Sequence, residues 1–473
     1  METSNQLSEV LAAQPRSRST TAGRKKLASV RMSPGGYLAV GAIMTFTALV
    51  SLRTQHDLLA LILVSATWTI VPLLVFTDRL SFDGTTLKRS GFGALPWRIF
   101  QRRVMRIALS DIEKIEVTSL RTLRRGGNVR YRYRVEISGS ESAVSFASGG
   151  RQFRRMVQAL LPRIAEPKLD ARACELRDHL VDARAARSEA TRLGIAPALV
   201  LENAAEAAEK RIEKHRREDL HVTSDQELER AVLLRRTAND LRMAGCLQQS
   251  AEAFRRALLI TPRNAWMIYE YARLLKSQAS AFGDARLLGR ACAALKLATL
   301  RGRRDARLLE RVGESFLEYC DPARAARTFK QALEMDENSY RAQLGLAEVA
   351  LGDGKLAHVI HHYNDAVRCA PDKATARLAR RESDYYSRLN SDEDYLAAEL
   401  RRMNWLEGAG RIQRLTARVS FAALLMALVG SSIDQVVAGL GWAMASSSII
   451  AWSGSLITRK FLSSRGRVEA SDA

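Results

Sequence analysis

Two long apolar runs, separated by a short polar break, constrain this chain more than any other feature. The runs span residues 36–52 and 58–76, and the break between them carries Arg53 and Asp57. A helix needs about 20 apolar residues to cross the hydrocarbon core of a bilayer, which is close to the length of each run. One continuous helix would bury the charges of the break in lipid at high cost. The sequence therefore predicts a transmembrane hairpin over residues 34–76, with the break in an aqueous turn.

A second interrupted apolar region lies near the C-terminus. Residues 419–433 and 436–457 are apolar, and "SIDQ" separates them. We expect a second transmembrane hairpin over residues 418–458; since its first run is short, a re-entrant segment or an interfacial helix is the alternative. Small residues recur at every fourth position of the second run and suit close helix packing, either against the first hairpin or against another copy of the chain in a homo-oligomer. They are Gly439, Ala443, Ser447 and Ala451.

Basic residues flank both hairpins on their outer sides, whereas the turn of the first hairpin has little net charge. Because such flanks stay in the cytoplasm, both ends of each hairpin are expected there. Arginine outnumbers lysine and alanine is abundant, which hints at a GC-rich bacterial genome. We therefore predict a multi-pass protein of the bacterial inner (cytoplasmic) membrane. Residues 1–33 read as a disordered basic N-terminus and residues 459–473 as a basic cytoplasmic tail.

Over residues 77–164 the apolar period changes from helical to alternating. "RLSFDGTTLKRSG" predicts two strands joined at Asp83-Gly84. "NVRYRYRVEISG" places Val, Tyr and Ile on one face of a strand and Arg on the other. "RQFRRMVQALLPRI" then has helical spacing. Antiparallel strands closed by one amphipathic helix, directly after a two-span hairpin and with the entry "SDIEKIEV", resemble the bacterial PH-like domains found beside membrane hairpins. This resemblance implies a fold more than a function.

The arginine-rich face of this module suggests contact with an anionic surface, as does the formal net charge of +22. Each basic residue beside an anionic leaflet contributes about 1 kcal/mol of binding free energy, so the face could dock on anionic phospholipid. A solvated face that follows the positive-inside bias is the alternative. Nucleic-acid binding is disfavoured, because the tyrosines of "RYRYR" belong to the apolar face and leave the arginines without a stacking platform. The proposed lipid face is Arg102, Arg103, Arg124, Arg125, Arg130, Arg132 and Arg134.

An internal repeat follows a helical linker, rich in Ala, Glu and Arg, over residues 165–229. A small residue recurs at spacings of 34, 41 and 34, namely at Ala238, Ala272, Gly313 and Ala347. A large residue recurs in the same register at Phe254, Leu295, Phe329 and Tyr363, each followed three positions later by an alanine. This register is similar to the tetratricopeptide repeat (TPR) over residues 231–373, with about seven extra residues in the second unit around "SQASAFGDA". The resemblance implies a solenoid with a capping helix over residues 230–390, and a helical connector follows over residues 391–417.

The TPR resemblance also implies a peptide- or protein-binding groove on the concave side of the solenoid. In that family, first-helix positions near the small packing residue line the groove. Arg235 with Asn239 resembles half of a clamp for a C-terminal carboxylate, although Glu270 stands where such a clamp needs an amide. The groove would be basic at one end and acidic at the other. Its predicted residues are Arg235, Asn239, Arg242, Tyr269, Arg273, Lys276, Glu310, Glu314 and Glu348.

Motifs that could carry chemistry are weak. "HVIHH" has histidines at helical spacing but no nearby Cys or convincing carboxylate partner for a metal. "GDGK" lacks the upstream Gly and the following Ser or Thr of a phosphate-binding loop. The five cysteines form no CxxC pair, which favours reduced thiols over a disulfide framework or a zinc site. We predict no catalytic residue, no metal and no cofactor.

These patterns together predict a mainly α membrane protein with a TPR-like α-solenoid, a small antiparallel β module and two transmembrane helical hairpins. The predicted function is a membrane-anchored, non-catalytic scaffold or adaptor that binds partner proteins through the TPR groove. The alternative is a regulatory subunit of a membrane transport or cell-envelope assembly complex. The apolar runs contain almost no ionisable residue, which favours the adaptor.

Overall fold

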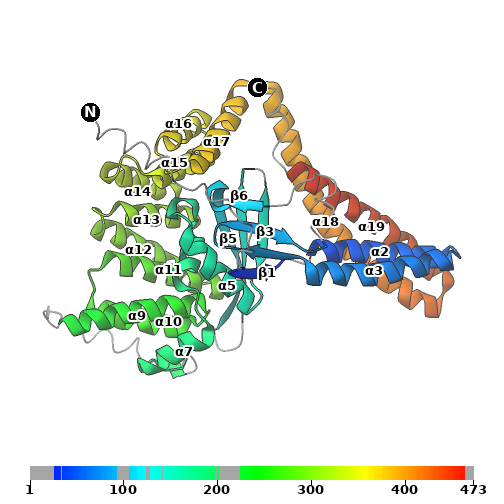
Figure 1. Cartoon of the computed structure of the whole chain (residues 1–473), viewed down its shortest axis with the longest axis horizontal. Coiled ribbons are helices and arrows are strands. Elements are labelled where there is room, and N and C mark those ends of the chain that lie inside the picture. The colour runs from blue at the N-terminus through cyan, green and yellow to red at the C-terminus, as the bar shows by residue number, and fades with distance from the viewer. Residues whose placement is uncertain are drawn as a thin grey trace, which may run out of the picture.

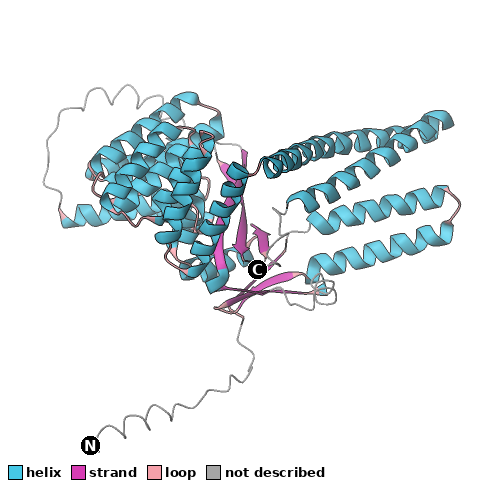
Figure 2. Cartoon of the chain, turned by 90° about the horizontal axis from the view of Figure 1, so that it is seen from above, coloured by secondary structure: helices cyan, strands magenta, loops and turns pink. Residues whose placement is uncertain are grey.

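The computed structural model describes residues 26–32, 35–92, 106–123, 128–140, 142–197, 200–201 and 224–463. Figure 1 shows a stack of helices on one side, a β module at the centre and long helices that project from the other side. Seen from above, the long helices extend as two hairpins in the same general direction (Figure 2). The mainly helical fold with a small antiparallel sheet module agrees with the sequence expectation.

Two antiparallel sheets and one helix form the β module. The first sheet has the strand order β1 (Ala28–Arg31), β2 (Arg79–Phe82), β3 (Thr86–Ser90) and β4 (Arg106–Ala108). The second sheet has the order β5 (Ile112–Leu123), β6 (Val129–Gly139) and β7 (Ala143–Ala147), and α5 (Arg151–Leu160) follows it. Phe82, Ile115, Ile137, Phe146 and Met156 are fully buried in one core that both sheets share with α5. The alternating pattern of each strand is what lets its apolar face enter this core.

The first strand precedes the first long hairpin in sequence. Ala28 pairs with Phe82 and Val30 pairs with Leu80, so the hairpin is inserted between two neighbouring strands of one sheet. The sequence pattern predicts an unstructured segment through residue 33, whereas residues 28–31 form this strand. A four-residue strand is too short to be recognised alone, because its partner lies beyond the hairpin. The remainder of the predicted disordered segment, residues 1–25, lies outside the described residues.

Four helices are long and apolar enough to cross a membrane: α2 (Gly35–Arg53), α3 (Asp57–Thr77), α18 (Glu393–Ile433) and α19 (Gln435–Ser463). The polar break after α2 is a turn in which Gln55 has a positive φ of 61°. At the base of this hairpin, Asp78 accepts hydrogen bonds from the Tyr37 hydroxyl at 2.6 Å and from the Arg89 Nε at 3.0 Å. This contact joins both helices of the hairpin to β3. The predicted connector over residues 391–417 is continuous with the first C-terminal apolar run within α18.

Small residues let α18 and α19 approach closely. A Cβ at Gly441 would lie 2.5 Å from the backbone nitrogen of Ala427, and Ala445 is fully buried. The predicted stripe is offset from this interface: Ala443, Ser447 and Ala451 are exposed in the single chain. The small residues that pack α19 against α18, such as Gly441 and Ala445, are therefore not the ones in the predicted every-fourth-residue stripe.

The helical stack consists of antiparallel pairs. Its helices are α9 (Asp225–Met243), α10 (Leu247–Ile260), α11 (Ala265–Phe282), α12 (Ala285–Arg301), α13 (Ala306–Glu318), α14 (Pro322–Met335), α15 (Tyr340–Gly352), α16 (Leu356–Arg368) and α17 (Lys373–Ser391). Ala238, Ala272, Ala347, Ala257, Ala298, Ala332 and Ala366 are all fully buried. The small-residue register thus sits where paired helices touch, and the TPR-like prediction is confirmed. The extra residues of the second unit lengthen α11 and α12, and Gly283 ends α11 with a φ of 71°.

The first turn of the solenoid docks directly on the β module. The backbone N–H of Val129, at the start of β6, donates to the carbonyl of Gly245 between α9 and α10 at 2.9 Å. Gly245 has a φ of 82°, and a Cβ there would lie only 1.7 Å from the Val129 carbonyl oxygen. Leu241 and Leu247 are fully buried in the same cluster as Val129. A side chain at position 245 would therefore separate the two modules.

Gly245→Ala tests this contact, with Gly354→Ala as a matched control. Gly354 occupies the corresponding turn between α15 and α16 with a φ of 73°, but a Cβ at this position would have no other atom within 4 Å. Both variants carry the strain of a left-handed non-glycine residue, about 1–2 kcal/mol, whereas only Gly245→Ala adds a backbone clash. We expect a clearly larger fall in the thermal midpoint of the detergent-solubilised chain for Gly245→Ala. Equal falls would contradict the docking contact.

Candidate protein-binding groove

A segment of the chain itself lies on the face of the solenoid formed by the first helix of each pair, which we call the concave face. It comprises the 3₁₀ turn Glu166–Lys168 and α6 (Ala171–His179), and we refer to residues 166–179 as the groove segment. Leu169 bridges to Ile115 of β5, so the segment runs between the edge of the second sheet and the solenoid. Leu176 is fully buried and Cys174 is 3% exposed. The sequence predicts an exposed helical linker with partial packing over residues 165–229, and residues 166–179 are a packed part of it.

Asp170 begins α6 and ties it to the sheet. Its carboxylate accepts hydrogen bonds from the backbone N–H groups of Ala173 at 2.6 Å, as an N-cap, and of Val117 in β5 at 2.9 Å. Burial raises the pKa of Asp170 to about 6, against the opposing effect of these two hydrogen bonds. The cap therefore fixes where the helix starts relative to the sheet, and so which side chains of α6 face the solenoid.

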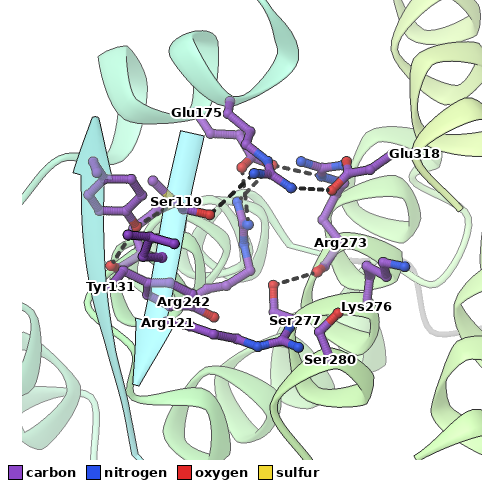
Figure 3. A pocket seen from close by; sticks show the side chains of 14 residues that line it. Ser119, Arg121, Tyr131, Glu175, Arg242, Arg273, Lys276, Ser277, Ser280 and Glu318 are labelled. Atoms are coloured by element: carbon purple, nitrogen blue, oxygen red, sulfur yellow. Dashed lines mark hydrogen bonds and ion pairs between the residues drawn. The ribbon is translucent and has the colours of Figure 1, made fainter. Parts of the chain in front are cut away.

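Glu175 of α6 is held between two arginines of the solenoid. Its Oε1 lies 3.1 Å from an Nη of Arg242 on α9 and 2.8 Å from the Nε of Arg273 on α11 (Figure 3). Both guanidinium groups are almost fully buried. Burial by itself would raise the pKa of Glu175, but the charges and hydrogen bonds of Arg242 and Arg273 outweigh it and hold the pKa far below its usual range. The carboxylate is therefore ionised and paired.

The same kind of contact continues along later repeats. Glu166 accepts hydrogen bonds from Arg311 at 2.6 Å and from Arg307. Arg341 of α15 donates to the backbone carbonyls of Glu166 and Leu169 at 3.2 and 3.0 Å. In the opposite polarity, Arg172 of α6 pairs with Glu318 of α13 at 2.9 Å, and Lys168 pairs with Asp372 at 2.7 Å. The groove segment is thus bound by charged side chains from all four helix pairs and from the N-cap of the capping helix α17.

The predicted groove residues fall into three groups. Arg242 and Arg273 contact the groove segment, as described. Arg235 and Asn239 contact Glu270 instead: Arg235 Nε and Nη2 lie 2.6 and 2.5 Å from its carboxylate oxygens, and Asn239 Nδ2 lies 2.8 Å from one of them. The half-clamp is therefore occupied by a carboxylate of the neighbouring repeat.

The remaining predicted residues lie on the first helices with other partners. Lys276 stacks over the ring of Tyr319 at 4.8 Å, Glu310 accepts a hydrogen bond from Ser339, and Glu314 pairs with Arg341. Tyr269 is buried and Glu348 is exposed. Sequence reasoning missed Arg311, Arg341 and Glu318, because only the positions three before, one after and four after each small packing residue were considered. A count of every charged residue on the first-helix face would have included them.

The predicted lipid face is described in part. Arg130, Arg132 and Arg134 are exposed on β6 and alternate with tyrosines that face the solenoid; the Tyr133 hydroxyl donates to the Met243 carbonyl at 3.2 Å. The other members, Arg102, Arg103, Arg124 and Arg125, lie outside the described residues. The tyrosine face is therefore part of the interface between the modules, and the arginine face points away from it.

The histidines of "HVIHH" make ordinary polar contacts. His362 Nδ1 lies 3.0 Å from Gln343 Oε1, and His361 Nε2 lies 3.5 Å from Asp365. Within the described part of the chain, no group of three or more His, Cys, Asp or Glu residues is placed to hold a metal ion. The concave face of the solenoid is the site with the greatest concentration of buried charge, and the candidate site is placed there.

Comparison with solved structures gives similar helical proteins at low identity. TTC0263, a thermophilic TPR protein in Thermus thermophilus, is 18% identical over 42% of this chain and 98% of its own, with a TM-score of 0.28. The MamA protein is 15% identical over 35% of this chain and 96% of its own, with a TM-score of 0.26. No protein-family model and no curated protein matches the chain. The TPR-like assignment of residues 225–391 rests on the helix packing described above.

Glu175→Ala should destabilise the folded chain strongly, because it leaves Arg242 buried without a carboxylate. Removing one partner of a buried ion pair costs about 3–5 kcal/mol. Glu189→Ala is the matched control, since Glu189 pairs with Arg192 at 3.4 Å on the exposed surface of α7 (Ala183–Arg192), where an ion pair contributes about 0–1 kcal/mol. Thermal denaturation of the detergent-solubilised chain measures both. A loss for Glu175→Ala no greater than that of the control would contradict a structural role for this pair.

Proposed function

We propose that this protein is a membrane-anchored, non-catalytic scaffold that recruits a partner protein through the concave face of its TPR-like solenoid. One observation carries the proposal: this face already holds a helical segment by carboxylate–guanidinium pairs. A TPR-like solenoid is a protein-interaction fold, and its helix pairs present a continuous wall that a folded or extended segment can follow. The groove segment is therefore a template for the kind of partner that the wall accepts.

The template gives the partner's chemistry. A competing segment would carry acidic residues for Arg242, Arg273 and Arg311, and a basic residue near Glu318. It would have to displace residues 166–179, which are held at high effective concentration because they belong to the same chain. Binding of a partner would thus be coupled to release of α6 from the groove. This coupling makes the scaffold selective for a partner that matches the charge pattern over several repeats.

The long apolar helices supply the proposed anchor. The basic residues outside both hairpins favour cytoplasmic ends, so the solenoid and the β module would work in the cytoplasm beside the bilayer. A four-stranded and a three-stranded sheet closed by a helix support the PH-like assignment of the β module. Its exposed Arg130, Arg132 and Arg134 are available for anionic phospholipid, at about 1 kcal/mol for each residue near the surface.

A labelled peptide of residues 165–182 tests the groove. It should bind the full-length Glu166→Ala/Glu175→Ala variant more tightly than wild type, because the tethered copy then competes less well. Adding Arg273→Glu and Arg311→Glu to that variant should abolish binding, whereas adding Arg132→Glu, on the far face of β6, should leave it unchanged. Fluorescence anisotropy measures the affinities, and far-UV circular dichroism checks that each variant is folded.

Equal affinity for all of these chains would refute recognition by the groove. Proximity labelling in cells with the same variants then separates true partners from background. A partner's labelling should follow the order found with the peptide, highest where α6 is weakened and lowest where the groove arginines are reversed.

Membrane topology is tested independently of the groove. A fluorescent protein that matures only in the cytoplasm should be fluorescent when fused after Ala473. Alkaline phosphatase, which is active only in the periplasm, should be active when inserted beside Asp434, because this turn would lie on the periplasmic side of the membrane. The protein should also stay in the pellet after alkaline carbonate extraction. If alkaline phosphatase were instead active when fused after Ala473 and inactive when inserted beside Asp434, the topology would be the reverse of the one proposed.

A further inference from the structure

A polar cavity of about 550 Å³ lies where the second sheet meets the groove segment and the first three helix pairs. Figure 3 shows its walls: Ser119, Arg121 and Tyr131 from β5 and β6, Glu175 from α6, and Arg273, Ser277 and Ser280 from α11. Three parts of the chain that are distant in sequence therefore contribute to one cavity, which is partly open to solvent. Its volume lies within the range of about 300–1,000 Å³ that is usual for small-molecule sites.

Positive charge exceeds negative charge in this cavity. Five basic side chains line it, and two carboxylates face them: Arg121, Arg172, Arg242, Arg273 and Lys276, with Glu175 and Glu318. Glu175 forms ion pairs with both Arg242 and Arg273, and Glu318 forms ion pairs with both Arg273 and Arg172. Three guanidinium groups thus share two carboxylates, so the buried network keeps a net positive charge. A cavity of this kind attracts an anion.

Two cations at the cavity have no carboxylate partner among the residues that the structure describes. Arg121 extends from β5 toward Ser280 (Figure 3), and Lys276 lies over the ring of Tyr319 at 4.8 Å. Neither is held in an ion pair within the described part of the chain, so both are available to a ligand. Their charges add to the excess of the guanidinium network.

A buried donor is also unsatisfied. The Nε of Arg242 has no hydrogen-bond partner among the described residues, although the Arg242 side chain is only 6% exposed. A buried polar group without a partner is costly, and such groups in folded proteins usually mark a missing water, ion or ligand. This donor belongs to the same guanidinium network whose other atoms line the cavity, so the network is not fully satisfied by the carboxylates of the described residues.

We propose that the cavity binds the phosphate group of a small soluble phosphorylated molecule, with inorganic phosphate as its minimal form. Phosphate brings up to two negative charges and several acceptor oxygens, and guanidinium groups bind it with two parallel hydrogen bonds. A single carboxylate would leave more of the excess charge uncompensated. The hydroxyls of Ser119, Ser277 and Ser280 supply further donors. The cavity is lined by residues of α9, α11 and α13, and these helices lie on the opposite side of the β module from the long hairpins (Figure 1). This placement favours a soluble ligand over a lipid headgroup.

The ligand would bridge the β module, α6 and the solenoid. It would contact Arg121 of β5, Arg172 of α6 and Arg242 of α9, so its binding free energy would add to the stability of their packed arrangement. This inference does not depend on a partner protein in the groove. A phosphate-binding cavity would act in the chain whether the groove is occupied by α6 alone or also exchanges with a partner.

The test uses the full chain in detergent at constant ionic strength. Inorganic phosphate, a nucleoside diphosphate and micelles containing an anionic phospholipid are compared with chloride by thermal shift and by isothermal titration calorimetry. We expect phosphate and the nucleoside diphosphate to raise the thermal midpoint. Arg121→Ala and Lys276→Ala should each weaken binding about tenfold, the equivalent of one charge-assisted hydrogen bond. Arg327→Ala, which removes an exposed arginine of α14 outside the cavity and the proposed lipid face, should bind as wild type does.

Tighter binding of the nucleoside diphosphate than of phosphate would support a larger phosphorylated ligand, and equal binding would support phosphate recognition alone. The proposal is overturned if neither soluble ligand shifts the midpoint beyond chloride, or if only the lipid micelles do. It is also overturned if Arg327→Ala loses as much affinity as Arg121→Ala, because binding would then follow overall charge rather than the cavity.

Discussion

The buried pairing of Glu175 with Arg242 and Arg273 holds together the part of this molecule that lies outside the long apolar helices. Two guanidinium groups on separate helix pairs share one carboxylate, which comes from a helix that is anchored to the sheet through Asp170. A charge buried in this way is tolerated only when its partner stays in place. The solenoid, the groove segment and the second sheet are consequently fixed together as one unit rather than as modules on a flexible linker. The contact between Val129 and Gly245 reinforces this arrangement at the first turn of the solenoid.

The first long hairpin is attached through strand pairing. Because β1 precedes the first hairpin and β2 follows it, both ends of that hairpin enter the same sheet. Asp78 at the base accepts hydrogen bonds from Tyr37 and Arg89, so the hairpin also has a side-chain attachment. The second hairpin instead continues from the capping helix through the 41-residue α18. The part of the chain outside the long helices is thus attached to apolar helices at both of its ends, which suits the proposed membrane-anchored scaffold.

The concave face carries several buried charged side chains, and it is occupied by the groove segment of the same chain. An open groove would leave these charges without partners. The charges of α6 pair with Arg242, Arg273 and Glu318 of the solenoid. At the polar cavity, Arg242 still keeps an unsatisfied donor, and Arg121 and Lys276 have no carboxylate partner in the described residues. The groove and the cavity therefore share residues but differ in what they require: the first a segment with alternating charges, the second a compact anion.

The sequence by itself determined the features that depend on local periodicity. The polar break between apolar runs placed the turn after Arg53, the 34-residue spacing located the buried Ala238 and Ala347, and the alternation of "VRYRYRV" assigned the faces of β6, because each of these is set by neighbours within one or two elements. Only the tertiary structure decided that β1 belongs to the sheet, that Glu270 fills the half-clamp of Arg235 and Asn239, and that Glu175 occupies the groove. These contacts join residues between 31 and 98 positions apart, and no short pattern encodes a pairing at that separation. The short, weakly amphipathic α6 takes its place from the buried charges around it, which become visible only when the helices are stacked.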